Sequence, residues 1–399
     1  MNILFIGGIY SDHLIPEFKK NSKSGYQFAA QALQESIVKG LLENNISVHI
    51  LSFPSVSTFP FNYKKPFLKP NEFIFASHKI GETIGRINIP ILKYEIGYQA
   101  KIDRWFHKTE GKKYVLIYSL QAKFLEIAKY IKETYPKTEV VIVVPDLPEF
   151  MAWNKYYERL GLKKKNIDSI YRNLKFVDKF VLLSKHMTDK LPIGEKPWIV
   201  IEGIFNPSQY NFTSPIKKDK NKIILYTGNI DRRYGIMDVV YAFTKISDDN
   251  LSLWICGFGD SENEICEYEK KDHRIKFFGS ITRDKALLFQ KQAFMLINPR
   301  HSNEEFTKYS FPSKTMEYLA SGTPTLMCKL QCIPSEYEEH LFFIKDETIE
   351  GYKNAILNVL QRTSSELEEF GEKAQRFIIE SKNPRTQVNR IISFMESEK

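Results

Sequence analysis

The segment from Phe311 to Pro324 carries the residues whose types and spacing point most clearly to chemistry. Its sequence predicts a short helix with both ends marked, because Pro312 is tolerated in a first turn and Gly322 ends a helix. One face of this helix is apolar at the spacing i, i+3, i+4, formed by Met316, Leu319 and Ala320. Glu317 lies off that face, a little more than one turn from the helix start.

The start of this helix has the properties of an anion site. Free backbone N–H groups and the positive end of the helix dipole meet there, and Lys314 adds a charge. The hydroxyl of Ser313 can reach the first-turn donors. A diphosphate held at Ser313, Lys314 and Thr315, with a ribose hydroxyl pair at Glu317, matches this spacing. The alternative is an ordinary amphipathic helix with a solvated glutamate.

A second group of basic residues lies in the turn from Thr227 to Gly235. Arg232 and Arg233 are adjacent there, and a guanidinium can grip phosphate through two hydrogen bonds. We expect Arg233 to be the more important of the two for phosphate binding. The alternative is a basic turn exposed to solvent.

Small and basic residues also follow two other expected strands. Gly257 and Gly259 come after one of them, where glycine allows the backbone to approach a ligand or simply forms a tight turn. Arg300 comes after another, and the sequence leaves open whether it faces a phosphate or the solvent.

These residues must be positioned by an alternation of strands and helices in both halves of the chain, which predicts α/β domains with parallel sheets. In the first half we expect strands at 2–7, 48–52, 114–118, 139–144, 179–183 and 199–201. In the second half we expect them at 223–226, 253–256, 275–278, 294–298 and 325–328. Ligands of such folds bind outside the carboxyl ends of the strands, so the second half is the expected nucleotide domain.

Three segments are assigned by pattern and composition. A helix is expected from about Gln27 to Glu43. The stretch from Phe53 to Pro90 is rich in aromatic residues and proline without a clear period, and we expect irregular elements that form an acceptor surface. The lysine-rich run from Ser214 to Lys222 is the expected linker or entry loop of the second half.

The Phe311–Pro324 segment resembles the donor-site helix of retaining GT-B glycosyltransferases, the large family 4 and its relatives. Their common pattern is Glu-x7-Glu, and Glu317 matches the second Glu while Tyr309 occupies the first position. A subgroup with Phe-Pro-Ser-Lys before the helix is similar to this chain and also lacks the first acid. Because the donor-sugar loop here ends in Tyr309 and Ser310, the resemblance leaves open how the sugar is held.

The resemblance implies a GT-B architecture, with two Rossmann-like doubly wound domains facing a cleft. The acceptor-side domain would span residues 1–205 and the nucleotide-sugar domain residues 206–383. A C-terminal helix at 384–399 would cross back to the first domain, as in GT-B relatives.

The resemblance also implies roles in the donor domain. Family members carry G-R-x-x-x-x-K-G in the turn that here begins at Gly228, and Asn229 and Tyr234 replace the Arg and Lys that grip the diphosphate. The charge is therefore displaced to Arg233 and its neighbour. The loop from Gly279 to Thr282, which includes Ile281, resembles the one that holds the nucleotide base through backbone groups.

In the first half, Gly7 and Gly8 resemble the glycine loop near the donor diphosphate and acceptor. Asp146 matches the Asp of a His-Asp pair in which Pro145 replaces the His. Asp146 would orient the acceptor hydroxyl or the transferred sugar; its alternative is to cap the next helix.

Composition limits the classes of partner. The formal net charge is +9, with basic clusters at Lys19-Lys20, Lys112-Lys113, Lys163–Lys165 and Lys217-Lys218. No nucleic-acid motif accompanies them, so the charge indicates either anionic lipid headgroups or a generally basic proteome. No apolar run spans a bilayer, the first residues do not form a signal peptide, and the four cysteines have no zinc-like spacing. We expect a cytoplasmic protein, peripheral at the inner membrane face, with reduced thiols.

The predicted function is a metal-independent, retaining transfer of a sugar from a UDP- or GDP-sugar, with no further cofactor. No Asp-x-Asp follows a strand to hold a metal. The expected acceptor is a glycan or lipid-linked saccharide in surface polysaccharide synthesis. Two alternatives remain: a non-catalytic GT-B partner of an active transferase, and a GT-B sugar-nucleotide epimerase.

Overall fold

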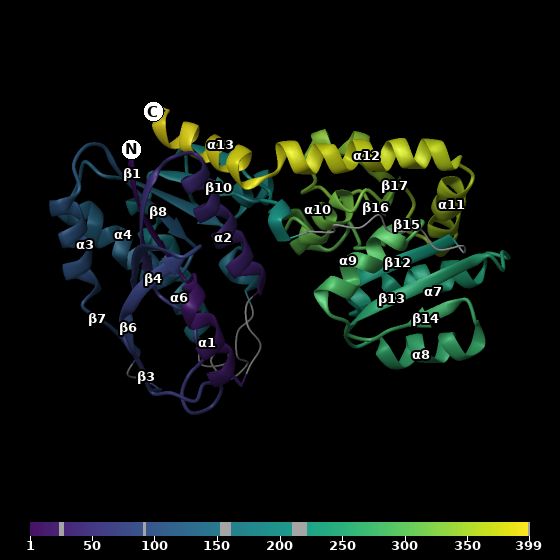
Figure 1. Ribbon diagram of the computed structural model, residues 1–399, viewed down its shortest axis with the longest axis horizontal. Coiled ribbons are helices and arrows are strands. Elements are labelled where there is room, and N and C mark those ends of the chain that lie inside the picture. Colours follow the sequence, from purple (N-terminus) through teal and green to yellow (C-terminus); the bar gives the residue numbers. More distant parts are fainter. Residues whose placement is uncertain (24–27, 91–92, 152–160, 210–221, 398–399) are drawn as a thin grey trace. The chain divides into compact units, whose positions relative to one another are not determined.

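Figure 1 shows the computed structural model of the chain, which describes residues 1–23, 28–90, 93–151, 161–209 and 222–397. The chain forms two compact units. Unit 1 comprises residues 1–204 together with 384–399, and unit 2 comprises residues 205–383. The expected linker at 214–222 and the expected helix start at Gln27 lie almost entirely outside the described residues.

Unit 1 is built on an eight-stranded sheet. In spatial order its strands are β11 (Trp198–Val200), β10 (Lys179–Leu182), β9 (Glu139–Val144), β8 (Lys113–Tyr118), β1 (Asn2–Gly7), β2 (Ser47–Ser52), β5 (His78–Thr83) and β4 (Asn71–Phe75). Every neighbouring pair is parallel except β4 with β5. The described helices of this unit are α1 (Ile15–Asn21), α2 (Phe28–Glu43), α3 (Tyr98–Lys108), α4 (Ala122–Thr134), α6 (Leu162–Asn173) and α13 (Pro384–Glu396).

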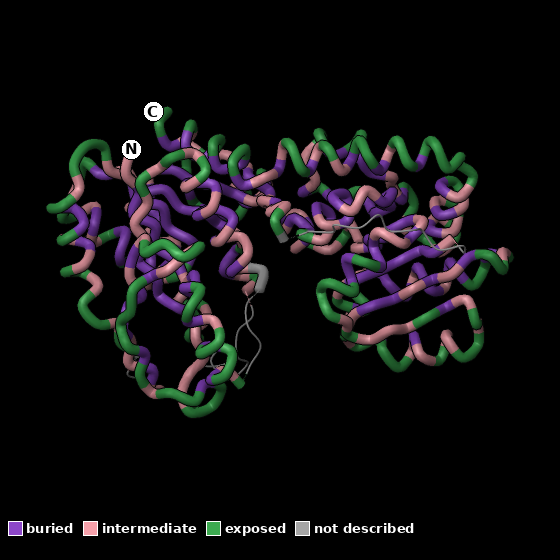
Figure 2. Tube along the Cα trace, in the orientation of Figure 1, coloured by how far each residue is buried: buried purple, intermediate pink, exposed green. Residues whose placement is uncertain are grey.

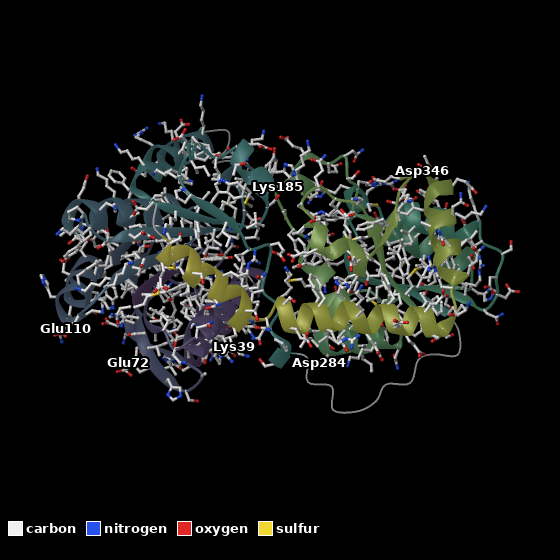
Figure 3. All side chains as sticks on the ribbon, turned by 90° about the horizontal axis from the view of Figure 1, so that it is seen from above. Lys39, Glu72, Glu110, Lys185, Asp284 and Asp346 are labelled. Carbon is white, nitrogen blue, oxygen red and sulfur yellow. The ribbon has the colours of Figure 1, made fainter. Side chains whose placement is uncertain are left out.

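The prediction of irregular structure over residues 53–90 was wrong. This stretch holds the antiparallel pair β4 and β5, which extends the main sheet, and exposed Glu72 projects from the edge strand (Figure 3). It also holds two strands of a separate small sheet in the order β3 (Phe67–Leu68), β6 (Gly85–Asn88) and β7 (Lys93–Ile96). These strands are two to six residues long and interrupted by proline and glycine, so no sustained period of two marks them in the sequence.

Unit 2 has a six-stranded parallel sheet. Its spatial order is β14 (Ile275–Phe277), β13 (Leu251–Phe258), β12 (Lys222–Asn229), β15 (Met295–Asn298), β16 (Thr325–Cys328) and β17 (Phe342–Ile344). Its helices are α7 (Ile236–Thr244), α8 (Glu262–Lys271), α9 (Arg283–Gln292), α10 (Ser313–Ala320), α11 (Ile349–Leu360) and α12 (Ser364–Ser381). Numbered along the chain, this is the 3-2-1-4-5-6 order of a dinucleotide-binding domain.

The α/β prediction is confirmed, and the pattern of burial explains it. The central strands are almost continuously apolar and buried, as parallel strands covered on both faces must be (Figure 2). Successive residues of β12 enter different cores: Ile224 and Tyr226 join one apolar cluster, while Ile223 and Leu225 join another. The helices on the two faces therefore bury alternate residues of the same strand.

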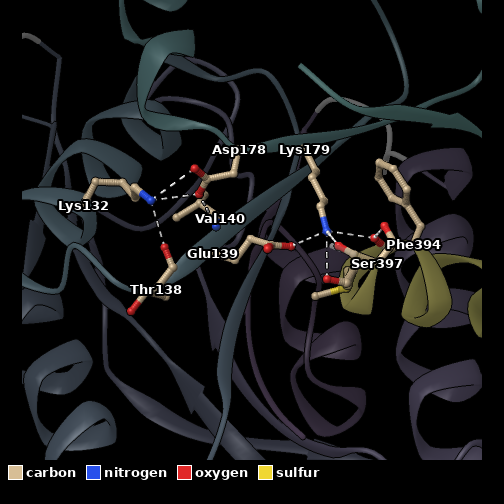
Figure 4. Close-up of polar contacts among 9 residues, drawn as sticks. Lys132, Thr138, Glu139, Val140, Asp178, Lys179, Phe394 and Ser397 are labelled. Carbon is tan, nitrogen blue, oxygen red and sulfur yellow. Dashed lines mark hydrogen bonds and ion pairs between the residues drawn. The ribbon is translucent and has the colours of Figure 1, made fainter. Parts of the chain in front are cut away.

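The C-terminal helix α13 packs on α2 within unit 1. Gly40 allows the close approach, because a Cβ there would lie 2.4 Å from both the Pro384 carbonyl oxygen and Val388 Cγ2. At its far end, α13 is held by Lys179, which is fully buried (Figure 4). Its Nζ donates to the carbonyls of Phe394, Met395 and Ser397 at 2.7–3.0 Å and pairs with Glu139 at 3.0 Å.

Replacing Lys179 with methionine should therefore loosen α13. The change leaves three carbonyls and a carboxylate without their cation, and we expect a loss of about 2–3 kcal/mol in the protection of α13 amides. Hydrogen exchange of α13 and β10 measures this. The matched control is Lys129→Met, whose exposed pair with Glu133 should contribute less than about 0.5 kcal/mol. Equal protection in the two variants would contradict this role for Lys179.

Candidate functional site

The strand order of unit 2 reverses between β12 and β15, and a cavity of about 330 Å³ lies at this point. Ligands of doubly wound sheets bind at such a reversal, beside the carboxyl ends of the strands. The cavity is lined from β12, from β15 and from the start of α10, by Tyr226, Thr227, Gly228, Asn229, Tyr234, Asn298, Arg300, Ser310, Phe311, Pro312, Ser313, Lys314 and Tyr318. No carboxylate is among these residues, whereas two cations are.

The start of α10 points its free backbone donors at this cavity. The helix begins at Ser313, Pro312 is its N-cap, and no side chain caps it. The expectation that the Ser313 hydroxyl caps the helix was therefore wrong, and no side chain occupies the N–H groups of Ser313 and Lys314. Thr315 does not contribute as expected, because it is fully buried and its N–H donates to the Pro312 carbonyl at 2.8 Å.

Arg300 supplies the most constrained charge of the site. Its guanidinium lies over the rings of Phe306 and Tyr234, at 4.6 and 5.5 Å from their centroids. Its Nε is buried and has no hydrogen-bond partner among the described residues. Burial lowers the pKa of Arg300 and the neighbouring Arg233 lowers it further, although Tyr234 opposes the shift. A partly buried cation with one unsatisfied donor, in a cavity without acids, is suited to an anionic ligand.

The two arginines of the preceding turn are placed differently. Arg233 stacks on Tyr234, 5.1 Å from its centroid, and is 5.9 Å from that of Phe306, so it shares the aromatic pair with Arg300. Its side chain is 59% exposed and pairs with Asp231 at 3.5 Å, so Arg233 lies beside Arg300 but outside the lining of the cavity. Arg232 instead pairs with Glu264 on α8 and does not line the cavity. The expected phosphate contact of Arg232 is therefore not supported by its placement.

Glu317 lies one turn further along α10 and is largely buried. Its Oε1 accepts hydrogen bonds from Gln290 at 2.7 Å and Lys314 at 2.8 Å. Burial raises the pKa of this carboxyl, but the charge and hydrogen bond of Lys314, with the hydrogen bond of Gln290, outweigh it, so the pKa is lowered. Glu317 is thus an ionised acceptor at neutral pH. It lines a second cavity of about 270 Å³, between α9, α10 and α12.

A hydrogen-bond network fixes the geometry between the two cavities. The Tyr318 hydroxyl lies 2.8 Å from the Thr227 backbone N and donates to the Thr227 carbonyl at 3.0 Å, which ties α10 to the end of β12. Gln290, fully buried on α9, donates to the Thr227 hydroxyl as well as to Glu317. Lys314 contacts the first cavity and pairs with Glu317 in the second. One surface of α10 therefore links the two cavities.

His301, which the sequence did not single out, anchors the loop that follows Arg300. Its Nε2 lies 3.0 Å from Asp238 on α7, and its Nδ1 lies 3.3 Å from Glu347. The hydrogen bond to Asp238 is the main cause of a raised pKa for His301, which burial opposes. Gly235, at φ 76°, permits the close packing here, because a Cβ would lie 2.2 Å from the Pro299 carbonyl. These residues lie far apart in the sequence, and only the folded structure brings them into contact.

The other residues expected in unit 2 lie at strand ends, and not all of them reach a cavity. Gly257 donates its N–H to Gly279 at 2.9 Å, and Gly259 packs against the backbone of the Arg232 turn. Ile281 packs at the edge of a small apolar cluster that contains Cys256. Tyr309 is buried and does not line the first cavity, so the position of the missing acid is filled by a packed side chain.

The residues expected from the first half all lie in unit 1. Gly7 ends β1 and faces Gln34 of α2, whose Oε1 would lie 2.4 Å from an added Cβ. Gly8 follows it beside the backbone of Phe53. Asp146 is exposed after β9 and raises the pKa of Tyr118, which burial raises more. It does not cap the next short helix, whose N-cap is Leu147, so that alternative was wrong.

Three general features of the described residues complete the description. None of their helices is both long and apolar enough to cross a membrane. No group of three or more His, Cys, Asp or Glu side chains in that part of the chain is arranged to hold a metal ion. The four cysteines are free thiols.

The fold and the cavity define the architecture of the class, a pair of Rossmann-like units of the GT-B type. Residues 209–377 match the family model of glycosyl transferases group 1. The structure is similar over 98% of both chains to sucrose-phosphate synthase from Thermosynechococcus elongatus, at 14% identity and a TM-score of 0.61. It is similar over the full length of both chains to HepE from Anabaena in complex with UDP, at 13% identity and a TM-score of 0.64.

A third similar structure is the lipopolysaccharide outer core galactosyltransferase WaaB, at 13% identity over 99% of both chains and a TM-score of 0.61. No curated protein matches the chain. Together the family match and the similar structures confirm the GT-B fold and support a glycosyltransferase.

The contacts of His301 predict a pH dependence of stability. Because its pKa is raised above the ordinary 6.5, the stabilisation is complete below about pH 6.5 and is lost as the pH rises through the raised folded-state value. Urea unfolding over this pH range should show stability falling in the wild type and a flatter profile in His301→Gln. The exposed His273→Gln is the control and should keep the wild-type slope. An unchanged slope in His301→Gln would refute the assignment.

Proposed function

We propose that the chain is a retaining glycosyltransferase that moves a sugar from a UDP- or GDP-sugar to a glycan or lipid-linked saccharide. The observation that carries this proposal is the partly buried Arg300 guanidinium, whose buried Nε has no acceptor among the described residues, facing an acid-free cavity at the N-terminus of α10. A diphosphate supplies the negative charge that this environment lacks. Arg233, beside Arg300, and Lys314 extend the same positive field.

In this proposal the second cavity binds the nucleoside half of the donor. Ionised Glu317 accepts hydrogen bonds from a pair of ribose hydroxyls, as an acceptor-only group does. Its lysine and glutamine partners hold it in one orientation, so little entropy is lost on binding. HepE is described in complexes with UDP and with UDP-glucose, which supports a uridine donor here.

The proposed chemistry uses the leaving diphosphate rather than a pair of carboxylates. As the bond from sugar to phosphate breaks, negative charge grows on the diphosphate, and Arg300, Arg233 and the helix N-terminus stabilise it. The leaving phosphate oxygen accepts the proton of the acceptor hydroxyl on the same face of the sugar, which retains the anomeric configuration. Because the positive charge comes from side chains and backbone, the proposal needs no metal. Asp146 and the Gly7-Gly8 loop of unit 1 orient the acceptor.

The acceptor side of the proposal is a surface-polysaccharide or lipid-linked precursor at the cytoplasmic membrane face. The description of WaaB as a lipopolysaccharide outer core galactosyltransferase supports this class of acceptor. The second candidate is a non-catalytic GT-B partner, which the packed Tyr309 and the Pro145 substitution favour.

A donor panel tests the proposal directly. Calorimetry with UDP-, GDP- and ADP-sugars should find one donor that binds and is slowly hydrolysed, and an acceptor assay read by NMR should show retained anomeric configuration. Hydrolysis without any transfer to glycan acceptors, with conversion of the sugar itself, would identify an epimerase. No binding of any nucleotide sugar would overturn the donor site and leave the non-catalytic partner.

Three variants test the contacts to the diphosphate and to the nucleoside of the donor separately. We expect Arg300→Gln to weaken UDP or GDP binding about 100-fold through lost charge-assisted hydrogen bonds, with little effect on the nucleoside. Glu317→Gln should weaken nucleoside and nucleotide alike, by about tenfold. Arg232→Gln is the matched control, since its guanidinium pairs with Glu264, and should stay near wild type. If Arg232→Gln weakened binding as much as Arg300→Gln, the assignment of Arg300 would be wrong.

A further inference from the structure

The small sheet β3-β6-β7 of unit 1 has its polar and apolar faces reversed. Antiparallel sheets normally turn their apolar face to the core and their polar face to water. The register pairs Phe67 with Ile87 and Ile87 with Tyr94, so these three side chains form one row across the sheet. Ile96, two residues after Tyr94, shares that face.

The opposite face of the small sheet is turned inward and is mostly polar, with buried Leu68 beside Arg86 as its apolar member. Arg86 pairs with Glu95 at 3.5 Å, and Glu95 also pairs with Lys123 at the start of α4. The side chains of Arg86 and Glu95 are only 17% and 14% exposed, and Asn88 of the same face is fully buried. Charged residues therefore face the body of unit 1, which fixes the outward direction of the apolar row.

The outward row is exposed to an extent that is unusual for apolar side chains. Phe67 is 56% exposed, Tyr94 63% and Ile96 50%, and Phe61 in the preceding loop is 67% exposed. A group of large apolar side chains on one face marks an interaction surface. We call Phe67, Tyr94 and Ile96 the apolar face.

Lysines surround this face. Lys64, Lys65 and Lys69 flank β3 and are exposed, and the nearby α1 adds exposed Lys19 and Lys20. The segment and α1 are adjacent, because the Lys64 ammonium donates to the Lys20 carbonyl and Lys65 pairs with Glu17 (Figure 1). Between residues 57 and 97 there are six basic and three acidic residues. The apolar face is therefore set in a positive surface.

We propose that the apolar face docks on an anionic lipid bilayer. Aromatic side chains settle at the headgroup level, and each lysine near a negative surface adds attraction. A second copy of this chain fits less well, because a two-fold interface would oppose the same lysines across the contact. This surface goes beyond the proposed sugar transfer and does not depend on it, since it lies in unit 1 and uses none of the donor-site residues.

Vesicle sedimentation of the full chain tests the proposal. We expect binding to phosphatidylcholine vesicles that contain phosphatidylglycerol, weaker binding to phosphatidylcholine alone, and loss of binding at high salt. The triple variant Phe67→Ser, Tyr94→Ser, Ile96→Ser should lose affinity by about tenfold or more, as should Lys64→Gln with Lys69→Gln. Trp198→Ser removes another exposed aromatic from the opposite edge of the main sheet and should bind as the wild type does.

Nucleotide binding by the same variants shows that unit 2 remains folded, and a thermal melt checks unit 1. Absence of wild-type binding to anionic vesicles, or undiminished binding by the triple variant, would overturn the proposal. A dimer that the triple variant abolishes, without vesicle binding, would assign the face to a second copy and also overturn it. Failure of the donor proposal has a different signature, namely vesicle binding without nucleotide binding.

Discussion

The partly buried positive charge of Arg300 is the constraint around which the cavity of unit 2 is arranged. Removing a guanidinium from water is costly unless an anion or polar acceptors replace the lost hydration. Here the adjacent surfaces are the faces of Tyr234 and Phe306, which stabilise a cation without neutralising it. The charge therefore remains available, and the uncapped start of α10 faces the same cavity. A ligand with concentrated negative charge resolves this imbalance.

The rigidity of the surroundings makes that charge useful. Tyr318 ties α10 to the carboxyl end of β12 through both the N–H and the carbonyl of Thr227. Gln290 joins the same network to Glu317, so the Glu317 carboxylate and the cavity beside Arg300 are positioned by one set of hydrogen bonds. On the other side of Arg300, His301 holds the loop between two carboxylates. Such support is what a site requires when its charges must meet a ligand without rearrangement.

The sequence predicted what local pattern determines. Continuous apolar runs gave the parallel strands, and proline and glycine bounded the helix that became α10. What escaped prediction depends on tertiary packing. Arg232 and Arg233 are neighbours in sequence, but Arg232 pairs with Glu264 on α8, while Arg233 stacks on the aromatic rings that it shares with Arg300. Arg300 was undecided for the same reason, because its burial against Phe306 and Tyr234 arises from separate turns of the chain. The small sheet was missed because its strands are short and separated by proline and glycine, so no sustained period of two marks them.

The outward apolar row of the small sheet and the Arg300 charge without an anion both depart from the packing rules that the rest of the molecule follows. In the cores of both units apolar residues are buried together, and the buried cation Lys179 is satisfied by carbonyls and a carboxylate. A fold tolerates a locally unfavourable arrangement when favourable packing around it contributes more free energy. Such arrangements occur mainly at functional sites, where binding of a ligand or a surface makes them favourable. In unit 2 this arrangement is a charge without an anion, which calls for a polar ligand. In unit 1 the unfavourable arrangement is the solvent exposure of Phe67 and Tyr94, which contact with an apolar and anionic surface would relieve. The two proposals thus assign a water-soluble activated donor to unit 2 and a membrane surface to unit 1.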